Sequence, residues 1–259
     1  MKRIELFCLF LAGVLVCNSS DAASPRRRPD ANSKPSGGMV EKPYSGNVFR
    51  FLDAQSTIPH EKMASYVQKM RWATILPFEV QAVPAAKSAS NGCKVAETLI
   101  SESRVGAGIV IVDDPASTQC IDYREANWAV LNLAFLKKDN PSLEKLEQRA
   151  IKILWIAAAR VLGAGYSNHM ISVLKPFRTL KELDRNPATK PSPDGFNAML
   201  ENAKAYGITT ITISSYRTAC RNGWAPAPTN AYQQAIWDEM KAEKERGPTN
   251  GLQIPPPKK

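Results

Sequence analysis

Apolar and polar positions alternate along the chain in patterns that predict strands and helices. Four runs of apolar or alternating residues predict strands at 48–52, 76–83, 106–112 and 128–135. The run at 106–112 is almost continuously apolar and rich in β-branched residues. That composition is typical of a central strand buried on both faces.

Apolar residues spaced three and four apart predict helices between and after these strands. The predicted helices begin at Pro59 and cover 95–100, 140–162, 193–206 and 230–244. In the longest one, Asn140 is the expected N-cap and Pro141 the first helical residue, with the end at Gly163 or Gly165. Gly207 is the expected C-cap of the predicted helix at 193–206.

The order of these elements is strand, helix, strand, helix, two strands and the long helix, followed by further helices and loops. Such an order predicts a mixed sheet backed by helices. We therefore expect the α+β class, in one domain that covers residues 47–254.

The two ends of the chain have a different composition from this domain. Residues 1–23 have a basic start, an 11-residue apolar run and small residues at the end, which predicts a signal peptide cleaved after Ala22 or Ala23. Cys17 raises the alternative of a lipid anchor, although Val16 is large for the position before a lipidated cysteine. Residues 24–46 are predicted to be a flexible basic linker and 255–259 a disordered tail.

Net charge and apolar content limit the classes of function. The chain carries a formal net charge of +10, of which +3 lies in 24–46, +3 in 241–259 and only +4 in 47–240. A nucleic-acid protein concentrates its charge on a folded face, so we expect no nucleic-acid partner. The basic ends favour solubility and attraction to anionic glycans. No segment after the signal is apolar enough to span a membrane, so we expect a secreted or periplasmic protein.

Three cysteines remain after the predicted cleavage, namely Cys93, Cys120 and Cys220. An odd number in an oxidising compartment allows one disulfide and one free thiol. Cys93 and Cys120 are the pair closest in sequence, so we expect a disulfide between them. Cys220 has no histidine or other base nearby in the sequence that would make it a catalytic thiol.

The end of the long helix and the loop after it carry the most specific pattern in the chain. Residues 156–166 read IAAARVLGAGY and residues 171–176 read ISVLKP. In outline these segments resemble the active helix and the Met-turn of the metzincin zinc proteases, especially the archaemetzincins. That helix carries HExxHxxGxxH or a shortened form that ends in GLGY, and a turn of the type SVMxP follows. The resemblance covers residues 47–185 and implies a zincin architecture.

Every metal-binding position of the motif is altered in this chain. With Gly163 on the motif glycine, the two helical histidine positions fall on Ile156 and Arg160. The remaining positions are the glutamate at Ala157, the third histidine at Tyr166 and the Met-turn methionine at Leu174. A catalytic zinc needs three protein donors, and isoleucine supplies none while arginine repels the ion. Alanine cannot activate water. We therefore predict no metal site, no cofactor and a pseudo-metalloprotease.

Few other side chains are candidates for catalysis or metal binding. Neither histidine is expected to bind zinc: His60 lies at the start of a predicted surface helix far away in the sequence, and His169 lies in the loop after the long helix, where it is expected to be solvated. Asp113 and Asp114 follow a buried strand, where side chains face clefts, but Asp-Asp-Pro is also an ordinary turn.

A last group of candidates lies near the C-terminus: Tyr216, Arg217, Arg221 and Trp224 are a possible aromatic and basic binding surface. The pattern around them, from Tyr216 to Trp237, also resembles a family of exported bacterial proteins from which no function is carried over.

These observations support three alternative functions. The first is a non-catalytic exported protein that binds peptide or glycoprotein in the former substrate cleft. The second is a hydrolase of another class with Asp113, Asp114 or Tyr166 in its chemistry. The third is a structural protein of the cell envelope that uses its basic ends.

Overall fold

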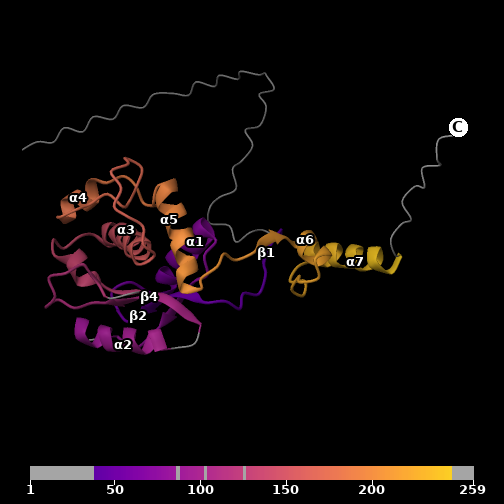
Figure 1. Ribbon diagram of the computed structural model, residues 1–259, viewed down its shortest axis with the longest axis horizontal. Helices are drawn as coiled ribbons and strands as arrows, with labels where there is room; N and C mark the ends of the chain where they lie inside the picture. Colours follow the sequence, from indigo (N-terminus) through magenta and orange to yellow (C-terminus); the bar gives the residue numbers. More distant parts are fainter. Residues whose placement is uncertain (1–37, 86–87, 102–103, 125–126, 247–259) are drawn as a thin grey trace, which may run out of the picture. The chain divides into compact units, whose positions relative to one another are not determined.

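The computed structural model describes residues 38–85, 88–101, 104–124 and 127–246 (Figure 1). The predicted signal peptide, the first part of the predicted linker and the predicted C-terminal tail lie outside the described residues. Within these ranges, no helix is both long enough and apolar enough to cross a membrane.

Five strands form one mixed sheet in the order β3-β2-β4-β6-β5. The strands are β2 (Val48–Asp53), β3 (Phe78–Ala82), β4 (Val105–Val112), β5 (Ile121–Tyr123) and β6 (Trp128–Asn132). The first four in this spatial order run parallel, and β5 pairs antiparallel with β6. All eight residues of the central strand β4 are buried, as its apolar run predicts. A mixed sheet backed by helices confirms the predicted α+β class.

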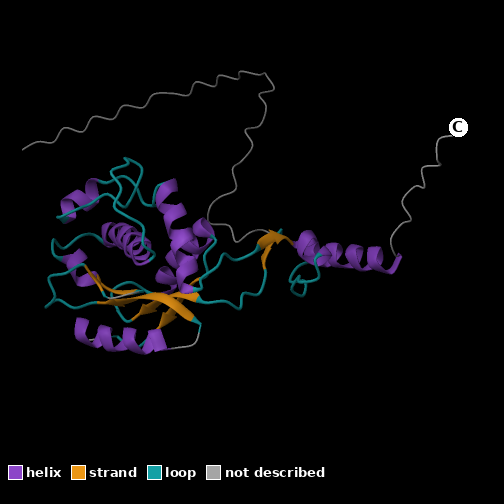
Figure 2. Cartoon of the chain, in the orientation of Figure 1, coloured by secondary structure: helices purple, strands orange, loops and turns teal. Residues whose placement is uncertain are grey.

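Helices cover both faces of this sheet (Figure 2). On one face lies α2 (Ala89–Ser101), and on the other lie α1 (His60–Thr74) and α3 (Leu143–Val161). Successive strand residues point to opposite faces. Accordingly, Ile109 and Ile111 of β4 belong to the core cluster that contains α1 and α3, whereas Val110 and Val112 belong to the cluster on the α2 side.

The long helix α3 starts later than its sequence predicts. Its N-cap is Ser142, whose side chain accepts a hydrogen bond from the Lys145 backbone. The prediction of Asn140 as N-cap is wrong, because Asn140 has a φ of 48° and its backbone N–H closes a turn onto Lys137. At the other end Gly163 has a φ of 74°, which glycine adopts without strain, so the predicted end at this residue is confirmed.

The predicted strand at 128–135 is also shorter than expected. β6 ends at Asn132, and the 3₁₀-helix η1 (Leu133–Lys137) follows at once. The Asn132 side chain accepts a hydrogen bond from Ala134 N and so caps η1. An N-cap asparagine thus overrides the apolar run that continues beyond it.

Beyond α3 the chain forms short elements. These are α4 (Leu180–Arg185), α5 (Pro193–Ala203), the 3₁₀-helix η2 (Lys204–Tyr206), β7 (Ile213–Ser215), α6 (Tyr216–Arg221) and α7 (Ala231–Arg246). Gly207 follows η2 with a φ of 67°, which confirms it as a C-cap. β1 (Met39–Glu41) pairs antiparallel with β7.

The strand β1 lies within the segment 24–46, which the sequence predicts to be a flexible linker. Its three residues are ordered by hydrogen bonds to β7, which lies far away in the sequence. The local composition does not indicate this distant partner, so the sequence alone predicts a linker here.

The predicted Cys93–Cys120 disulfide is not formed, since all three described cysteines are free thiols. Cys93 is part of α2 and packs against the cluster on that face of the sheet, whereas Cys120 packs against the cluster on the opposite face. Proximity in sequence is therefore misleading here, because the sheet separates the two side chains.

Candidate functional site

The motif positions lie at the end of α3 and in the loop after it. Ile156 and Ala157 are buried in the helix, and Leu174 is buried in the loop. Arg160 is partly buried in the last helical turn, and Tyr166 is 60% exposed. The chain leaves the helix at Gly163, where a side chain would meet the Asn202 amide.

A pocket of about 260 Å³ lies beside these residues. Its walls come from the edge strand β5 and the two residues before it, from α3 and η1, and from the loops that follow α3. The lining residues are Gln119, Cys120, Ile121, Tyr123, Phe135, Ile156, Tyr166, Pro176, Phe177 and Arg178. The structure thus brings two motif positions, Ile156 and Tyr166, into one pocket with the edge of the sheet.

Arg160 is not itself a lining residue, but its guanidinium group lies over the rings of two lining tyrosines. Its guanidinium carbon is 4.4 Å from the centre of the Tyr166 ring and 5.9 Å from that of the Tyr123 ring. Its Nη1 donates to the carbonyl of Ala164 at 3.0 Å. Its Nε is buried with no hydrogen-bond partner among the described residues. The cation is therefore held by stacking and by one carbonyl.

Burial suppresses ionisation in the pocket. It raises the pKa of the Cys120 thiol to about 12, with Lys138 acting weakly in the opposite direction. Burial likewise raises the pKa of the Tyr123 hydroxyl, although Arg160 opposes the shift. Both groups keep their protons at neutral pH, so neither serves as a ready nucleophile or base.

The residues at the motif positions do not fit a zinc ion. Of the three ligand positions, only Tyr166 has an oxygen donor, and a buried isoleucine and an arginine occupy the others. Within the described ranges, no group of three or more His, Cys, Asp or Glu side chains is placed to hold a metal. His169 lies nearby in sequence but is exposed, and its Nδ1 accepts from Ile171 N.

In the described part of the chain β5 is an edge strand. Cys120 O accepts from Asn132 N, and Arg124 N donates to Trp128 O, so the even-numbered residues bond to β6. Antiparallel pairing alternates, which turns the N–H and C=O groups of Ile121 and Tyr123 away from β6. The side chains of these two residues line the pocket. One stretch of chain thus offers both an open strand edge and pocket walls.

Asp113 and Asp114 have separate structural roles. Asp114 Oδ1 accepts from Ala116 N, as expected for a turn, and the Asp114 backbone forms hydrogen bonds with the Asn132 side chain. Asp113 Oδ2 accepts from Lys137 Nζ at 2.6 Å and from Thr57 Oγ1.

His60 lies in a further polar cluster, at the end of β2. Its Nδ1 is 2.8 Å from Oδ2 of the buried Asp53, and Gln55 donates to Oδ1 of the same carboxylate. Between described residues, no hydrogen bond or ion pair joins Asp53 or Asp113 to Tyr166. In the described part of the chain, Asp113 thus serves an ion pair and Asp114 a turn.

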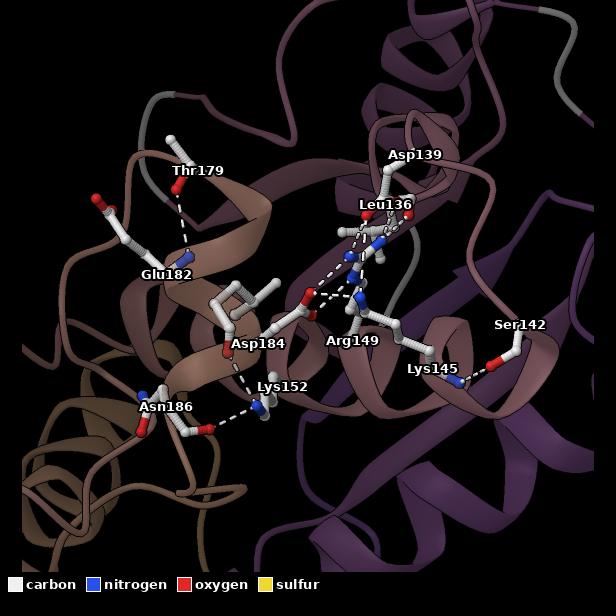
Figure 3. A network of polar contacts seen from close by, with 11 residues as sticks. Leu136, Asp139, Ser142, Lys145, Arg149, Lys152, Thr179, Glu182, Asp184 and Asn186 are labelled. Atoms are coloured by element: carbon white, nitrogen blue, oxygen red, sulfur yellow. Dashed lines mark hydrogen bonds and ion pairs between the residues drawn. The ribbon is translucent and has the colours of Figure 1, made fainter.

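The strongest polar network was not anticipated from the sequence. Arg149 of α3 is 1% exposed and donates to both oxygens of Asp139, to both oxygens of Asp184 and to Leu136 O (Figure 3). These bonds lower the pKa of Asp139 to about 2 and lower that of Asp184 as well. Nearby, the buried Lys152 donates to Leu183 O and Asn186 O. The network ties α4 and the η1 turn to α3.

The sequence did contain a signal for this network. Arg149 and Lys152 fall within the apolar pattern of the helix, and a charged residue inside a core needs partners. Charged residues at core positions of a predicted helix therefore indicate a buried polar network.

The predicted binding surface near the C-terminus is not assembled. Tyr216 is fully buried, and its hydroxyl donates to Pro226 O at 2.8 Å. Arg217 forms a two-bond ion pair with Glu239. Two of the four residues thus serve the packing of α6 against α7, and only Arg221 is well exposed.

Three solved structures are similar to this chain in overall arrangement. The archaemetzincin of Methanopyrus kandleri is 16% identical, with 61% of this chain and 96% of that chain covered, at a TM-score of 0.48. A zinc-dependent peptidase of Methanocorpusculum labreanum is 12% identical, with 59% and 100% covered, at 0.46. The archaemetzincin of Archaeoglobus fulgidus, complexed with malonate, is 13% identical, with 58% and 99% covered, at 0.42.

Comparisons at the level of sequence give no relative. No protein-family model matches the chain, and no curated protein matches it. The similarity to the three structures is one of arrangement and carries no residue role to this chain.

Proposed function

We propose that this chain is an exported, non-catalytic protein of metzincin-like architecture that binds an extended peptide, free or within a glycoprotein, in the pocket beside β5. The observation that supports this best is the composition of the pocket. It joins an open strand edge to the end of α3, where the motif positions carry Ile156 and Arg160 in place of metal donors.

The lack of catalysis is proposed from the chemistry of the lining. Hydrolysis of a peptide needs an activated water or a nucleophile together with a general base. The general-base position of the motif is Ala157, and the thiol of Cys120 stays protonated because its pKa is raised to about 12. Ile156 is closely packed and has no lone pair to offer.

Peptide as the ligand is proposed from the strand edge. An extended peptide can pair with the outward N–H and C=O groups of Ile121 and Tyr123, and such main-chain pairing gives affinity without a fixed sequence. Alternate side chains of the added strand then point into the pocket, where apolar and aromatic residues select among them.

Export is proposed from the composition of residues 1–23 alone. The ligand would then be a peptide or glycoprotein outside the cytoplasm, and the basic ends of the chain would add attraction to anionic glycans.

The test is a binding screen on arrays of extended peptides and mucin-type glycopeptides, with mass spectrometry to detect cleavage. We expect binding without cleavage. Tyr166→Ala should weaken the binding about tenfold, because an exposed aromatic wall is lost. Tyr232→Ala is the matched control, since Tyr232 is 61% exposed and lies outside the pocket on α7. Absence of binding to every array, or equal effects of the two variants, would overturn the proposal.

A further inference from the structure

Arg160 has far more hydrogen-bonding capacity than the described residues use. A guanidinium group carries five N–H donors. Among the described residues, it donates to the carbonyl of Ala164, and its Nε has no hydrogen-bond partner. No carboxylate in the described ranges forms an ion pair with it. A partly buried arginine without an anion is an unusual arrangement, because charged groups in protein interiors are normally paired.

The charge around the pocket favours an anion. Arg178 lines it, and Lys138 lies near enough to Cys120 to affect the thiol. None of the ten lining residues is acidic. Of the neighbouring acids, Asp122 is paired with Arg124 and Glu182 accepts from the backbone of Arg178. The cations therefore outnumber the acids at the pocket.

The rest of the pocket is apolar and small. Ile121, Ile156 and Phe177 supply hydrocarbon walls. Sites for drug-sized ligands measure roughly 300–1,000 Å³, so a volume of about 260 Å³ suits a smaller group. One amino-acid residue at the end of a chain combines an apolar side chain with a carboxylate in such a volume.

We propose that this pocket binds the C-terminal residue of a peptide, with the free carboxylate on Arg160 and an apolar side chain against Ile156 and Phe177. The inference rests on the proposed function and names its ligand class. The residues before the C-terminus pair with the edge of β5. Arg160, at a motif position that otherwise carries a metal ligand, would thus bind an anion.

Other peptide groups fit this site less well. An internal aspartate or glutamate presents a carboxylate but leaves the hydrocarbon walls without a partner. A C-terminal amide fills the same volume but is neutral, and it cannot accept two parallel hydrogen bonds from a guanidinium group.

The experiment compares pairs of peptides that differ only in a free or an amidated C-terminus. The peptides end in Leu, Phe or Val, and calorimetry measures their affinity for the purified protein. We expect the free acids to bind about 10- to 100-fold more tightly, which is the range for a hydrogen-bonded charge pair.

Variants of Arg160 then assign the preference. Arg160→Met should remove the difference between acid and amide, and Arg160→Lys should restore part of it because the charge returns without the planar fork. Arg185→Met is the control, since this exposed arginine of α4 neither lines the pocket nor, in the described contacts, stacks on a lining residue as Arg160 does. Circular dichroism and thermal unfolding of each variant show whether the fold is retained.

The outcomes separate this inference from the proposed function. Equal affinity for acids and amides would overturn the C-terminal assignment and leave peptide binding intact. A preference that persists in a folded Arg160→Met protein would place the carboxylate elsewhere and also overturn the assignment. If no peptide binds, with either a free or an amidated C-terminus, the proposed function itself is overturned.

Discussion

Helix α3 carries two arginines on one face, Arg149 and Arg160, eleven residues or about three turns apart. Their surroundings differ. Arg149 is enclosed by two carboxylates and a carbonyl that use all five of its donors. Arg160 stacks on tyrosine rings beside a pocket, and no described carboxylate pairs with it.

The difference distinguishes an arginine that holds the fold from one that is available to a ligand. A saturated guanidinium group contributes to stability through its partners and has nothing left to offer. An unsaturated one at a pocket gains its partners on binding, so its contribution appears as affinity and selectivity. Burial alone does not separate the two roles, whereas a count of satisfied donors does.

The largest effect on stability is expected from replacing Arg149. Arg149→Met should lower the free energy of unfolding by about 3–5 kcal/mol, because Asp139 and Asp184 lose their common partner. Arg160→Met should lower it by only about 1 kcal/mol, since one hydrogen bond and a stacking contact are lost. Urea unfolding measures both values, and similar losses in the two variants would show that the arginines have the same role.

The pH dependence of stability also tests the role of Arg149. Hydrogen bonds from Arg149 lower the pKa of Asp139 to about 2 and also lower that of Asp184, compared with about 3.9 for an unperturbed aspartate. A depressed carboxyl pKa stabilises the fold above the unfolded value, and this stability is lost as pH falls through the folded value. The free energy of unfolding should therefore decrease between about pH 4 and pH 2.

The Arg149→Met protein provides the control for this pH dependence. Its two aspartates lack the guanidinium group, so its unfolding free energy should vary less over the same pH range. An unchanged slope would assign the acid sensitivity to other carboxyl groups, such as Glu147, whose pKa is lowered by Lys62 and Tyr66.

A smaller effect is expected at the edge of the sheet. Ile121→Pro removes an outward N–H without breaking a β5–β6 hydrogen bond, so peptide affinity should fall about threefold to tenfold relative to Ile121→Ala. The alanine variant truncates the same side chain and keeps the N–H. Equal affinities of the two variants for a selected peptide, measured by calorimetry, would argue against pairing along β5.

Much of the fold follows from local patterns. The continuous apolar run of β4, the periodicity of α1 and α3, and Gly163 as one of two expected helix ends are local signals that the structure confirms. These features depend on burial and backbone conformation, which neighbouring residues largely determine.

The remaining features depend on contacts between distant segments. β1 is ordered by β7, and the apolar run after β6 is interrupted by the Asn132 cap. The sheet separates Cys93 from Cys120. Each outcome is decided by a partner or a face that the local sequence does not reveal.

The candidate site was predicted only in part. The motif positions were found from their spacing, and the structure brings Ile156 and Tyr166 into one pocket. The wall formed by Cys120, Ile121 and Tyr123 was missed, because an edge strand of three residues gives no periodic signal. The burial of Tyr216 was missed for a similar reason, since aromatic and basic residues in a row do not show which of them are buried.

The central claim is that the end of α3 binds peptide through an arginine and without a metal. Its most direct test is the affinity of a selected peptide, measured by calorimetry in excess chelator and again with added zinc, with the peptide examined afterwards. We expect the same affinity in both conditions and an intact peptide. Binding that the chelator abolishes, together with cleavage when zinc is present, would contradict it.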